Sequence, residues 1–278
     1  MALTTFIPQI WDARLLAHLD KAHVFANLVN RNYEGSITGQ GDTVHINQIG
    51  DVSIKNYTKN TDIDDPDALS TTDQTLVIDQ AKYFNFAVDD VDKVQAAGDL
   101  VDAATQRASY GLADADDQFV AGLLAAGVSA SNVIDTTALT SANAYDMLVA
   151  LGQKLDEANV TSIGRAVVVP PAFHSLLLKD NRFVTASEAA NSVLINGMVG
   201  NAAGFEIHKS NNCVKTADAT PVYSICAFVS DACTYAQQFL NTEAYRPQKR
   251  FSDAIKGLHV YGAKVTNGKE IAVLKGTF

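Results

Sequence analysis

Cysteine, long apolar runs and a recognisable leader are scarce or missing in this 278-residue chain, and each absence excludes a class of protein. The three cysteines, Cys213, Cys226 and Cys233, are an odd number without C-x-x-C spacing, which argues against a disulfide framework and a zinc site. No segment approaches the ~18 consecutive apolar residues of a membrane-spanning helix. The N-terminus lacks a basic leader followed by an apolar run. We therefore expect a soluble, intracellularly made protein with no membrane partner, whose cysteines are buried as small apolar residues.

Sequence signatures of common catalytic sites are also missing. The chain contains no G-x-x-x-x-G-K-[ST] phosphate loop, no H-E-x-x-H zinc motif and no G-x-S-x-G nucleophile motif. Gly197, Gly200 and Gly204 do not form a G-x-G-x-x-G motif after a strand, and they indicate a loop instead. The six histidines lack metal-ligand spacing and are expected at the surface or at interfaces. We therefore predict no catalytic residue, no cofactor and no metal site.

A basic face, which a protein needs to bind nucleic acid through its phosphates, is not evident in the sequence. The formal net charge is −10, and fifteen acidic against five basic residues lie between positions 51 and 117. The densest acidic run does not fit a calcium loop, because Asp67 and Asp73 stand where glycine and a bidentate glutamate are needed. We expect a solvated acidic loop here, with an incidental low-affinity cation site as the alternative.

The most informative feature that is present is a β-structured arm over residues 36–88. Apolar and polar residues alternate over 44–54 and again over 75–88, while residues 56–74 between them are almost wholly polar. An isolated two-stranded hairpin is marginally stable in water. The alternation changes phase near Ala81, which indicates a bulge or a passage from an exposed arm into a covered sheet. We expect the arm to rest on another subunit, as in an assembly protein.

Helical periodicity flanks this arm on both sides. Residues 10–30 form an amphipathic pattern, and Trp11 near its start is expected to dock on the body or on a neighbouring subunit. Apolar residues then recur every three or four positions from Val94 to Leu123, which predicts a spine helix about 45 Å long. Acidic residues, including Asp116 and Asp117, are assigned to its solvent-facing side.

The remainder of the chain has an α/β pattern. Helices are predicted over 142–158 and from Pro170 to 179, and strands over 165–169, 205–208 and 222–229. Asn267-Gly268 between two strand patterns predicts a closing hairpin of 258–266 with 269–274. A short basic cluster precedes this hairpin, and we expect it to be solvated or to form intersubunit ion pairs.

Four segments carry a family resemblance: G-D-T-V-H-I opening the arm, F-A-V-D-D-V-D-K-V-Q-A before the spine, R-A-V-V-V-P-P-A-F-H-S-L-L-L-K-D-N-R-F, and I-K-G-L-H-V-Y-G near the end. Their order resembles the major capsid proteins of tailed bacteriophages, which share the Hong Kong-97-type fold. The resemblance implies an α+β fold with an N-terminal arm (1–35), an extended β-arm (36–81), a peripheral domain with the spine helix (82–126 and 243–278) and an α/β axial domain (127–242).

The resemblance also implies a function. The chain would be the structural subunit of an icosahedral capsid shell, self-assembling into hexamers and pentamers and enclosing packaged double-stranded DNA without strong specific binding. A separate scaffolding protein and a portal would be its partners, and it would be assembled in the host cytoplasm and located in the virion. The lysine–asparagine cross-link of some relatives is not carried over, because no acidic catalyst is evident near Lys55 or Lys59.

Two other functions remain open on the sequence alone. One is the shell of a cellular nanocompartment with the same fold, which would enclose enzymes. The other is an α/β enzyme with a site in residues 127–242. For the shell reading, the residues expected at intersubunit contacts are Trp11, Lys55, Lys59, Asp62, Asp64, Asp65, Asp67, Arg246, Lys249 and Arg250.

Overall fold

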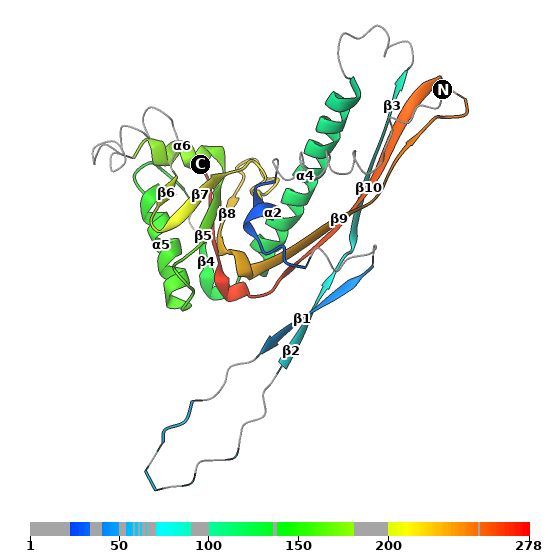
Figure 1. Ribbon diagram of the computed structural model, residues 1–278. Coiled ribbons are helices and arrows are strands. Elements are labelled where there is room, and N and C mark those ends of the chain that lie inside the picture. Colours follow the sequence, from blue (N-terminus) through cyan, green and yellow to red (C-terminus); the bar gives the residue numbers. More distant parts are fainter. Residues whose placement is uncertain are drawn as a thin grey trace.

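The computed structural model describes residues 23–33, 41–49, 54–57, 59–60, 62, 65, 71–89, 100–135, 138–180, 200–249 and 251–278. A long helix, α4, lies beside a tall β-sheet, a second sheet with two helices lies to one side, and a β-arm extends away from the body (Figure 1). The helices are α2 (Phe25–Leu28), α4 (Leu100–Gly127), α5 (Ala144–Glu157) and α6 (Pro171–Leu178). Of the helix predicted over 10–30, residues 10–22 lie outside the described residues, and the described remainder is helical only in α2.

The strands form three sheets. Strands β1 (Thr43–Ile49) and β2 (Thr71–Val77) pair as the arm, and the tall sheet has the order β3 (Gln80–Asp89), β10 (Ser252–Val265), β9 (Cys233–Tyr245). A six-stranded sheet has the order β4 (Val133–Asp135), β11 (Ile271–Gly276), β8 (Tyr223–Val229), β5 (Arg165–Val169), β7 (Phe205–Lys209), β6 (Asn201–Ala202). This mixture of helices and sheets confirms the α+β fold class.

The spine helix is confirmed, but its buried side differs from the prediction. It occupies Leu100–Gly127, and residues 94–99 lie outside the described part of the chain. The buried line contains Leu112, Val120 and Leu124, and Asp116 lies on the same line at a spacing of four residues. The assignment of Asp116 and Asp117 to the solvent-facing side was wrong, since both are buried. The buried side of the helix is therefore shifted by one position along the sequence from the alanine-rich side that the periodicity indicated.

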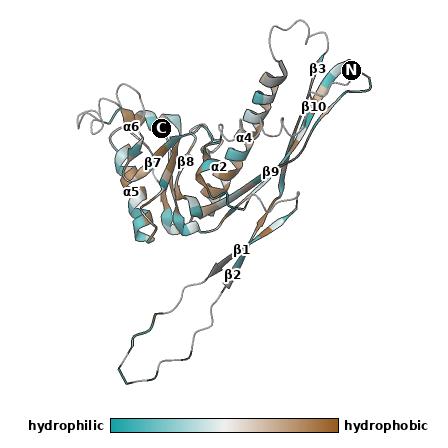
Figure 2. Ribbon diagram, in the orientation of Figure 1, coloured by the Kyte–Doolittle hydropathy of each residue, from teal (hydrophilic) through white to brown (hydrophobic). Residues whose placement is uncertain are grey.

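The six-stranded sheet separates two hydrophobic cores. Along β5, Val168 joins the core formed with α2 and α4, whereas Val167 and Val169 face the core formed with α5 and α6. A strand that is covered on both faces is a continuous apolar run, which explains the sequence R-A-V-V-V. Figure 2 shows the same concentration of hydrophobic residues in β8 and α2. The predicted elements α5, β5, α6, β7 and β8 are confirmed within a residue or two of their ends.

The predicted closing hairpin was wrong. Strand β10 pairs with β3 and β9, whereas β11 pairs antiparallel with β8 and parallel with β4, so the segments on either side of Asn267 belong to different sheets. Asn267 has an extended backbone with φ −140°, and its side chain accepts a hydrogen bond from the Lys269 amide. Gly268 is required for close packing, because a methyl group there would overlap the carbonyl oxygen of Gly127. The real hairpin partner of β10 is β9, which the sequence patterns did not reveal.

Three chain segments lead into the six-stranded sheet at one place, one of them from α4 and two from the tall sheet. They are the turn after α4, the 3-10 turn η3 (Ser230–Ala232) and the 3-10 turn η4 (Gly268–Glu270). Ser129 donates its amide to the Gly268 carbonyl at 2.9 Å, and Thr266 donates its amide to the Ala232 carbonyl at 3.0 Å. The Asn132 side chain adds bonds to the carbonyls of Lys269 (2.8 Å) and Ile271 (3.1 Å). We call this group of crossings the joint.

Candidate assembly surfaces and a buried carboxylate cluster

The arm is a regular antiparallel ribbon. Its register runs from Thr43 opposite Val77 to Ile49 opposite Thr71. The phase change predicted near Ala81 is a passage between sheets, because β2 ends at Val77 in the arm and β3 begins at Gln80 in the tall sheet. In Figure 1 the arm leaves the body at the foot of this sheet.

The base of the arm is fixed to the body. Ile46, Leu76 and Ile78 are buried against Ala236 and Val260 of the tall sheet. The strand β10 approaches the arm so closely that a methyl group at position 262 would overlap the Val77 carbonyl oxygen, and the sequence has glycine there. The side chain at position 74 also donates to the Thr266 carbonyl at 3.0 Å. The arm therefore has a rigid attachment at its base.

The far part of the arm carries exposed side chains of mixed character. Ile54 is 97% exposed and Tyr57 is 74% exposed, although both are large and apolar. Lys55, Lys59, Asp62 and Asp65 are exposed beside them. Asp64 and Asp67 of the predicted contact set lie outside the described residues. These exposed apolar side chains are the feature that a contact with another molecule would cover.

The basic cluster lies at the opposite end of the molecule. Arg246 and Lys249 are exposed in the turn between β9 and β10, whereas Arg250 and Trp11 lie outside the described residues. Figure 1 shows the β9–β10 turn at one end of the molecule and the arm at the other. The structure therefore does not bring the predicted basic and acidic contact residues together within one chain.

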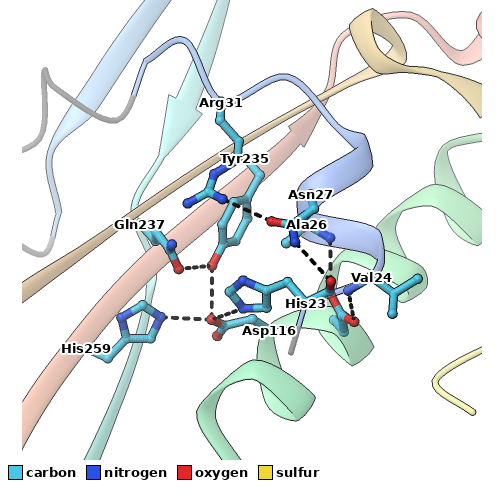
Figure 3. Close-up of polar contacts among 10 residues, drawn as sticks. His23, Val24, Ala26, Asn27, Arg31, Asp116, Tyr235, Gln237 and His259 are labelled. Carbon is cyan, nitrogen blue, oxygen red and sulfur yellow. Dashed lines mark hydrogen bonds and ion pairs between the residues drawn. The ribbon is translucent and has the colours of Figure 1, made fainter. Parts of the chain in front are cut away.

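The most organised polar site is a buried cluster around Asp116 of α4 (Figure 3). One carboxylate oxygen, Oδ2, lies 3.2 Å from His23 Nε2, 3.0 Å from the Tyr235 hydroxyl and 2.9 Å from His259 Nε2. The side chains of Asp116 and both histidines have no solvent exposure. These contacts join α4 to the segment before α2, to β9 and to β10.

The protonation state of the cluster follows from its geometry. Burial alone would raise the pKa of Asp116, but hydrogen bonds from His23 and His259 and the attraction of both rings outweigh burial and lower it. An ionised carboxylate only accepts hydrogen bonds, so each imidazole donates through Nε2. Burial and the nearby negative charges of Asp116 and Asp79 raise the pKa of Tyr261 to about 12. The cluster is thus a buried carboxylate that accepts hydrogen bonds from two imidazoles and one phenol.

The neighbouring Asp117 fixes the start of α2. Its carboxylate accepts the Val24 amide at 2.7 Å and the Ala26 amide at 3.1 Å. Burial raises the pKa of Asp117 in spite of these bonds. Asn30 then joins the edge of β9, donating its amide to the Cys233 carbonyl at 3.0 Å and accepting the Tyr235 amide at 2.9 Å. Residues 23–30 are therefore attached at both ends, and we infer that the cluster is structural.

Sequence reasoning missed this cluster. The histidines were expected at the surface or at interfaces, but His23 and His259 are buried inside the subunit, and His174 is buried as well. The sequence does contain an indication that Asp116 is buried. A four-residue spacing places it on the same side of the helix as Leu112, Val120 and Leu124, so a carboxylate lies in an apolar line. An acidic residue on such a line needs buried donors.

Other chemistry is limited in the described part of the chain. The cysteines are buried free thiols, as predicted, and burial raises the pKa of Cys213 and Cys233 to about 12 and raises the pKa of Cys226 as well. No group of three or more His, Cys, Asp or Glu residues among the described positions could hold a metal ion. No helix of the described residues is long and apolar enough to cross a bilayer.

Known proteins share both sequence and architecture with this chain. The sequence profile of a family described as phage capsid protein matches residues 71–275. A solved structure from Mycobacterium phage Che8 is 33% identical, with a TM-score of 0.75 over 99% of this chain and 94% of the other. The capsid of cyanophage P-SCSP1u gives a TM-score of 0.74 at 16% identity, over 99% and 90% of the two chains. A virus-like particle from Pyrococcus furiosus gives 0.57 at 13% identity, over 96% and 98%. No curated protein sequence matches significantly.

Proposed function

The chain belongs to the phage capsid protein family and is a capsid shell subunit. From this premise we propose that it self-assembles into the hexamers and pentamers of an icosahedral tailed-phage shell that encloses packaged double-stranded DNA. We further propose that a separate scaffolding protein and a portal are its partners, that assembly takes place in the host cytoplasm, and that the protein has no catalytic role.

The observation that carries this proposal is the arm. Its base is buried on its own body, whereas Ile54 and Tyr57 beyond the paired strands are 97% and 74% exposed. Burying a large apolar side chain contributes about 1.5–3 kcal/mol. A ribbon that is fixed at its base and carries exposed apolar side chains among charged ones farther out is suited to extend the interface of an assembled subunit onto its neighbour.

The charge distribution supports enclosure of DNA without strong binding. The region from 51 to 117 carries fifteen acidic and five basic residues, and the rest of the chain is neutral. Sequence-independent affinity for DNA requires many Lys or Arg contacts to phosphates. An acidic subunit can retain DNA by forming a closed wall, and this requires no attractive inner surface.

We retain the four-part division of the chain as a proposal: N-terminal arm (1–35), extended arm (36–81), peripheral domain (82–126 and 243–278) and axial domain (127–242). Within it, 243–278 supplies β10 to the tall sheet and β11 to the six-stranded sheet. The intersubunit contacts proposed from the sequence are likewise retained, with the acidic arm residues facing the basic β9–β10 turn of a second copy.

The arm can be tested by removal. Ile49 is paired with Thr71, so residues 50–70 can be replaced by a two-residue Asn-Gly turn without disturbing the paired strands. We expect a soluble subunit with unchanged helix content by circular dichroism that no longer forms closed shells when expressed with its neighbouring genes. Closed shells of this variant in negative-stain micrographs, equal in yield to the unmodified protein, would contradict the proposal.

Charge reversal tests the predicted ionic contacts separately. Changing Arg246, Lys249 and Arg250 to glutamate should reduce the yield of shells, because the arm of a second copy carries exposed Asp62 and Asp65. Reversing the arm residues to lysine in the same chain should restore the yield. Equal yields from the single and combined reversals would show that these charges do not meet.

A nanocompartment shell is less well supported. The Pyrococcus furiosus particle shares only the fold at 13% identity, whereas the phage structure at 33% identity spans 99% of the chain.

A further inference from the structure

Helix α4 has an open side that the described part of the chain does not cover. Tyr110 in the middle of this side is 66% exposed, and Arg107 and Gln118 on the same side are exposed as well. The opposite side carries the buried line of the helix, which includes Leu112 and Val120. Aromatic side chains contribute large contact areas wherever they are packed. Tyr110 therefore offers a seat for another segment.

A pocket of about 220 Å³ lies beside Tyr110, between α4, the start of α2 and the loop that follows β7. This volume is several times the ~30 Å³ share of one water molecule, so the pocket accommodates a side chain. Its charged lining groups are Asp114, Asp117 and Lys209, which place two carboxyl groups opposite one ammonium group. The pocket is therefore suited to a cationic side chain.

The walls of this pocket are fixed by hydrogen bonds. On one side, Asp117 accepts the Val24 amide at 2.7 Å, which holds the start of α2 against α4. On the other side, Ser210 donates its amide to the Val169 carbonyl at 3.1 Å, and Asn212 donates its amide to the Ser210 hydroxyl at 3.1 Å. A preformed site loses little ordering entropy when it is filled.

The N-terminal segment of the chain enters the described structure at this pocket. Val24 lines the pocket, and Lys21 precedes it by three residues. Each residue extends a chain by at most about 3.6 Å, so the Cα atom of Lys21 lies within about 11 Å of that of Val24. The segment thus brings a cation to a pocket that has an excess of carboxyl groups.

The pattern of residues 10–22 fits a helix that packs on the open side of α4. Trp11, Leu15 and Leu19 recur at a spacing of four, so a helix would place them on one side. At ~1.5 Å per residue such a helix is about 20 Å long, which is close to the length of α4 between Ala104 and Asp117.

We propose that residues 10–22 lie along the open side of α4 in the same subunit, with Lys21 in the pocket at Asp114 and the apolar side on Tyr110. This inference goes beyond the proposed function, because the contact forms within one subunit and precedes any shell. The same chain is the occupant because Val24 tethers the segment at the pocket wall, and a short tether gives an effective concentration in the millimolar range. The seat extends the attached part of the chain from His23 back to residue 10.

Trp11 is the only tryptophan of the chain, so its fluorescence tests the seat directly. In isolated subunits we expect Trp11 to be shielded from acrylamide, and Tyr110→Ala should raise its quenching towards that of the denatured chain. Tyr83→Ala is the matched control, because Tyr83 is an exposed tyrosine of β3, 78% exposed, and it should leave quenching unchanged. Equal quenching in wild type and Tyr110→Ala would overturn the inference.

Trypsin cleavage after Arg14 tests the charged contact. Cleavage follows the population of the undocked segment, so Asp114→Lys should accelerate it about tenfold in isolated subunits. Lys21→Glu in the same chain should restore the slow rate, because the two charges are then exchanged. An unchanged rate in Asp114→Lys, or no restoration in the double variant, would exclude Lys21 from the pocket. Circular dichroism checks that the variants remain folded.

Dilution identifies the chain that supplies the segment. Shielding of Trp11 should be independent of subunit concentration, because the contact lies within one subunit. Shielding that disappears on dilution would show that a second copy supplies the segment and would overturn the inference. Failure of the protein to form shells would contradict the proposed function and leave these measurements unaffected, so the two failures are distinguishable.

Discussion

Asp116→Asn should be the most damaging isosteric substitution in the spine. The carboxylate oxygen Oδ2 receives three donors, from His23, Tyr235 and His259, while Oδ1 is buried without a partner among the described residues. An asparagine can offer its oxygen to the three donors only by placing its NH2 group at the unpartnered position. A hydrogen bond to a charged group contributes ~1.5–3 kcal/mol and a neutral one ~0.5–1.5 kcal/mol, so three weakened bonds cost about 3 kcal/mol.

The assay is chemical denaturation followed by far-UV circular dichroism, combined with hydrogen exchange of residues 23–30. We expect the free energy of unfolding to fall by about 3 kcal/mol, and the amides of this segment to exchange faster. Asp114→Asn is the matched control on the same helix, because the partner of Asp114 among the described residues is the exposed Gln118 side chain at 2.9 Å, and its effect should stay within ~0.5 kcal/mol. A loss for Asp116→Asn no larger than that of the control would refute the argument.

The pH dependence of the same variant supplies an independent check. The folded-state pKa of Asp116 lies below its ordinary value of 3.8, so the ionised carboxylate stabilises the fold above that value. This contribution is lost as the pH falls from 3.8 through the lower folded-state pKa. The difference in unfolding free energy between wild type and Asp116→Asn should therefore shrink as the pH falls below 3.8. A difference that grows below pH 3.8 would contradict the assigned charge state.

Three further predictions concern packing, capping and thiol burial. Gly268→Ala should destabilise the protein by ~1–3 kcal/mol in denaturant titrations, because its methyl group overlaps the Gly127 carbonyl, whereas Gly122→Ala, which meets nothing within 4 Å, should stabilise α4 by up to ~1 kcal/mol. Asp117→Ala removes the acceptor of two amides at the start of α2, so it should cost ~1 kcal/mol and raise hydrogen exchange in residues 24–26; unchanged exchange there would contradict the capping role. The three buried thiols should react with a thiol reagent at pH 8 only after denaturation, and rapid labelling of the native protein would show that burial does not protect them.

The elements with strong periodicity could be predicted from the sequence. The spine helix, α5 and the arm have apolar spacings that indicate one backbone geometry each, and β5 is a short continuous apolar run that ends at Pro170; the structure contains all four. The family resemblance, carried by four short segments, is confirmed by the match over residues 71–275. These signals are local, and each can be recognised within a window of about 15 residues.

The parts that failed depend on long-range contacts. Asn267-Gly268 has the composition of a hairpin turn. Its glycine is instead required because the chain packs closely against the carbonyl oxygen of Gly127 at the end of α4. The cluster around Asp116 joins residues separated by 93, 119 and 143 positions, so no local pattern could reveal that His23, Tyr235 and His259 meet. Only the four-residue spacing of Asp116 with its apolar neighbours indicated burial. The adjacent alanine-rich line of the helix favoured a different buried side, so the prediction placed Asp116 in solvent.

The joint between the two sheets has a mechanical consequence. The part of the subunit made of α4 and the tall sheet is joined to the six-stranded sheet by three chain crossings, and hydrogen bonds link the crossings to one another, as between Ser129 and Gly268 and between Thr266 and Ala232. A single backbone cut at Gly268 would leave two covalent paths intact, so the two parts of the subunit would stay together. In a shell built of such subunits, one broken peptide bond at this boundary would therefore not separate the two parts of a subunit.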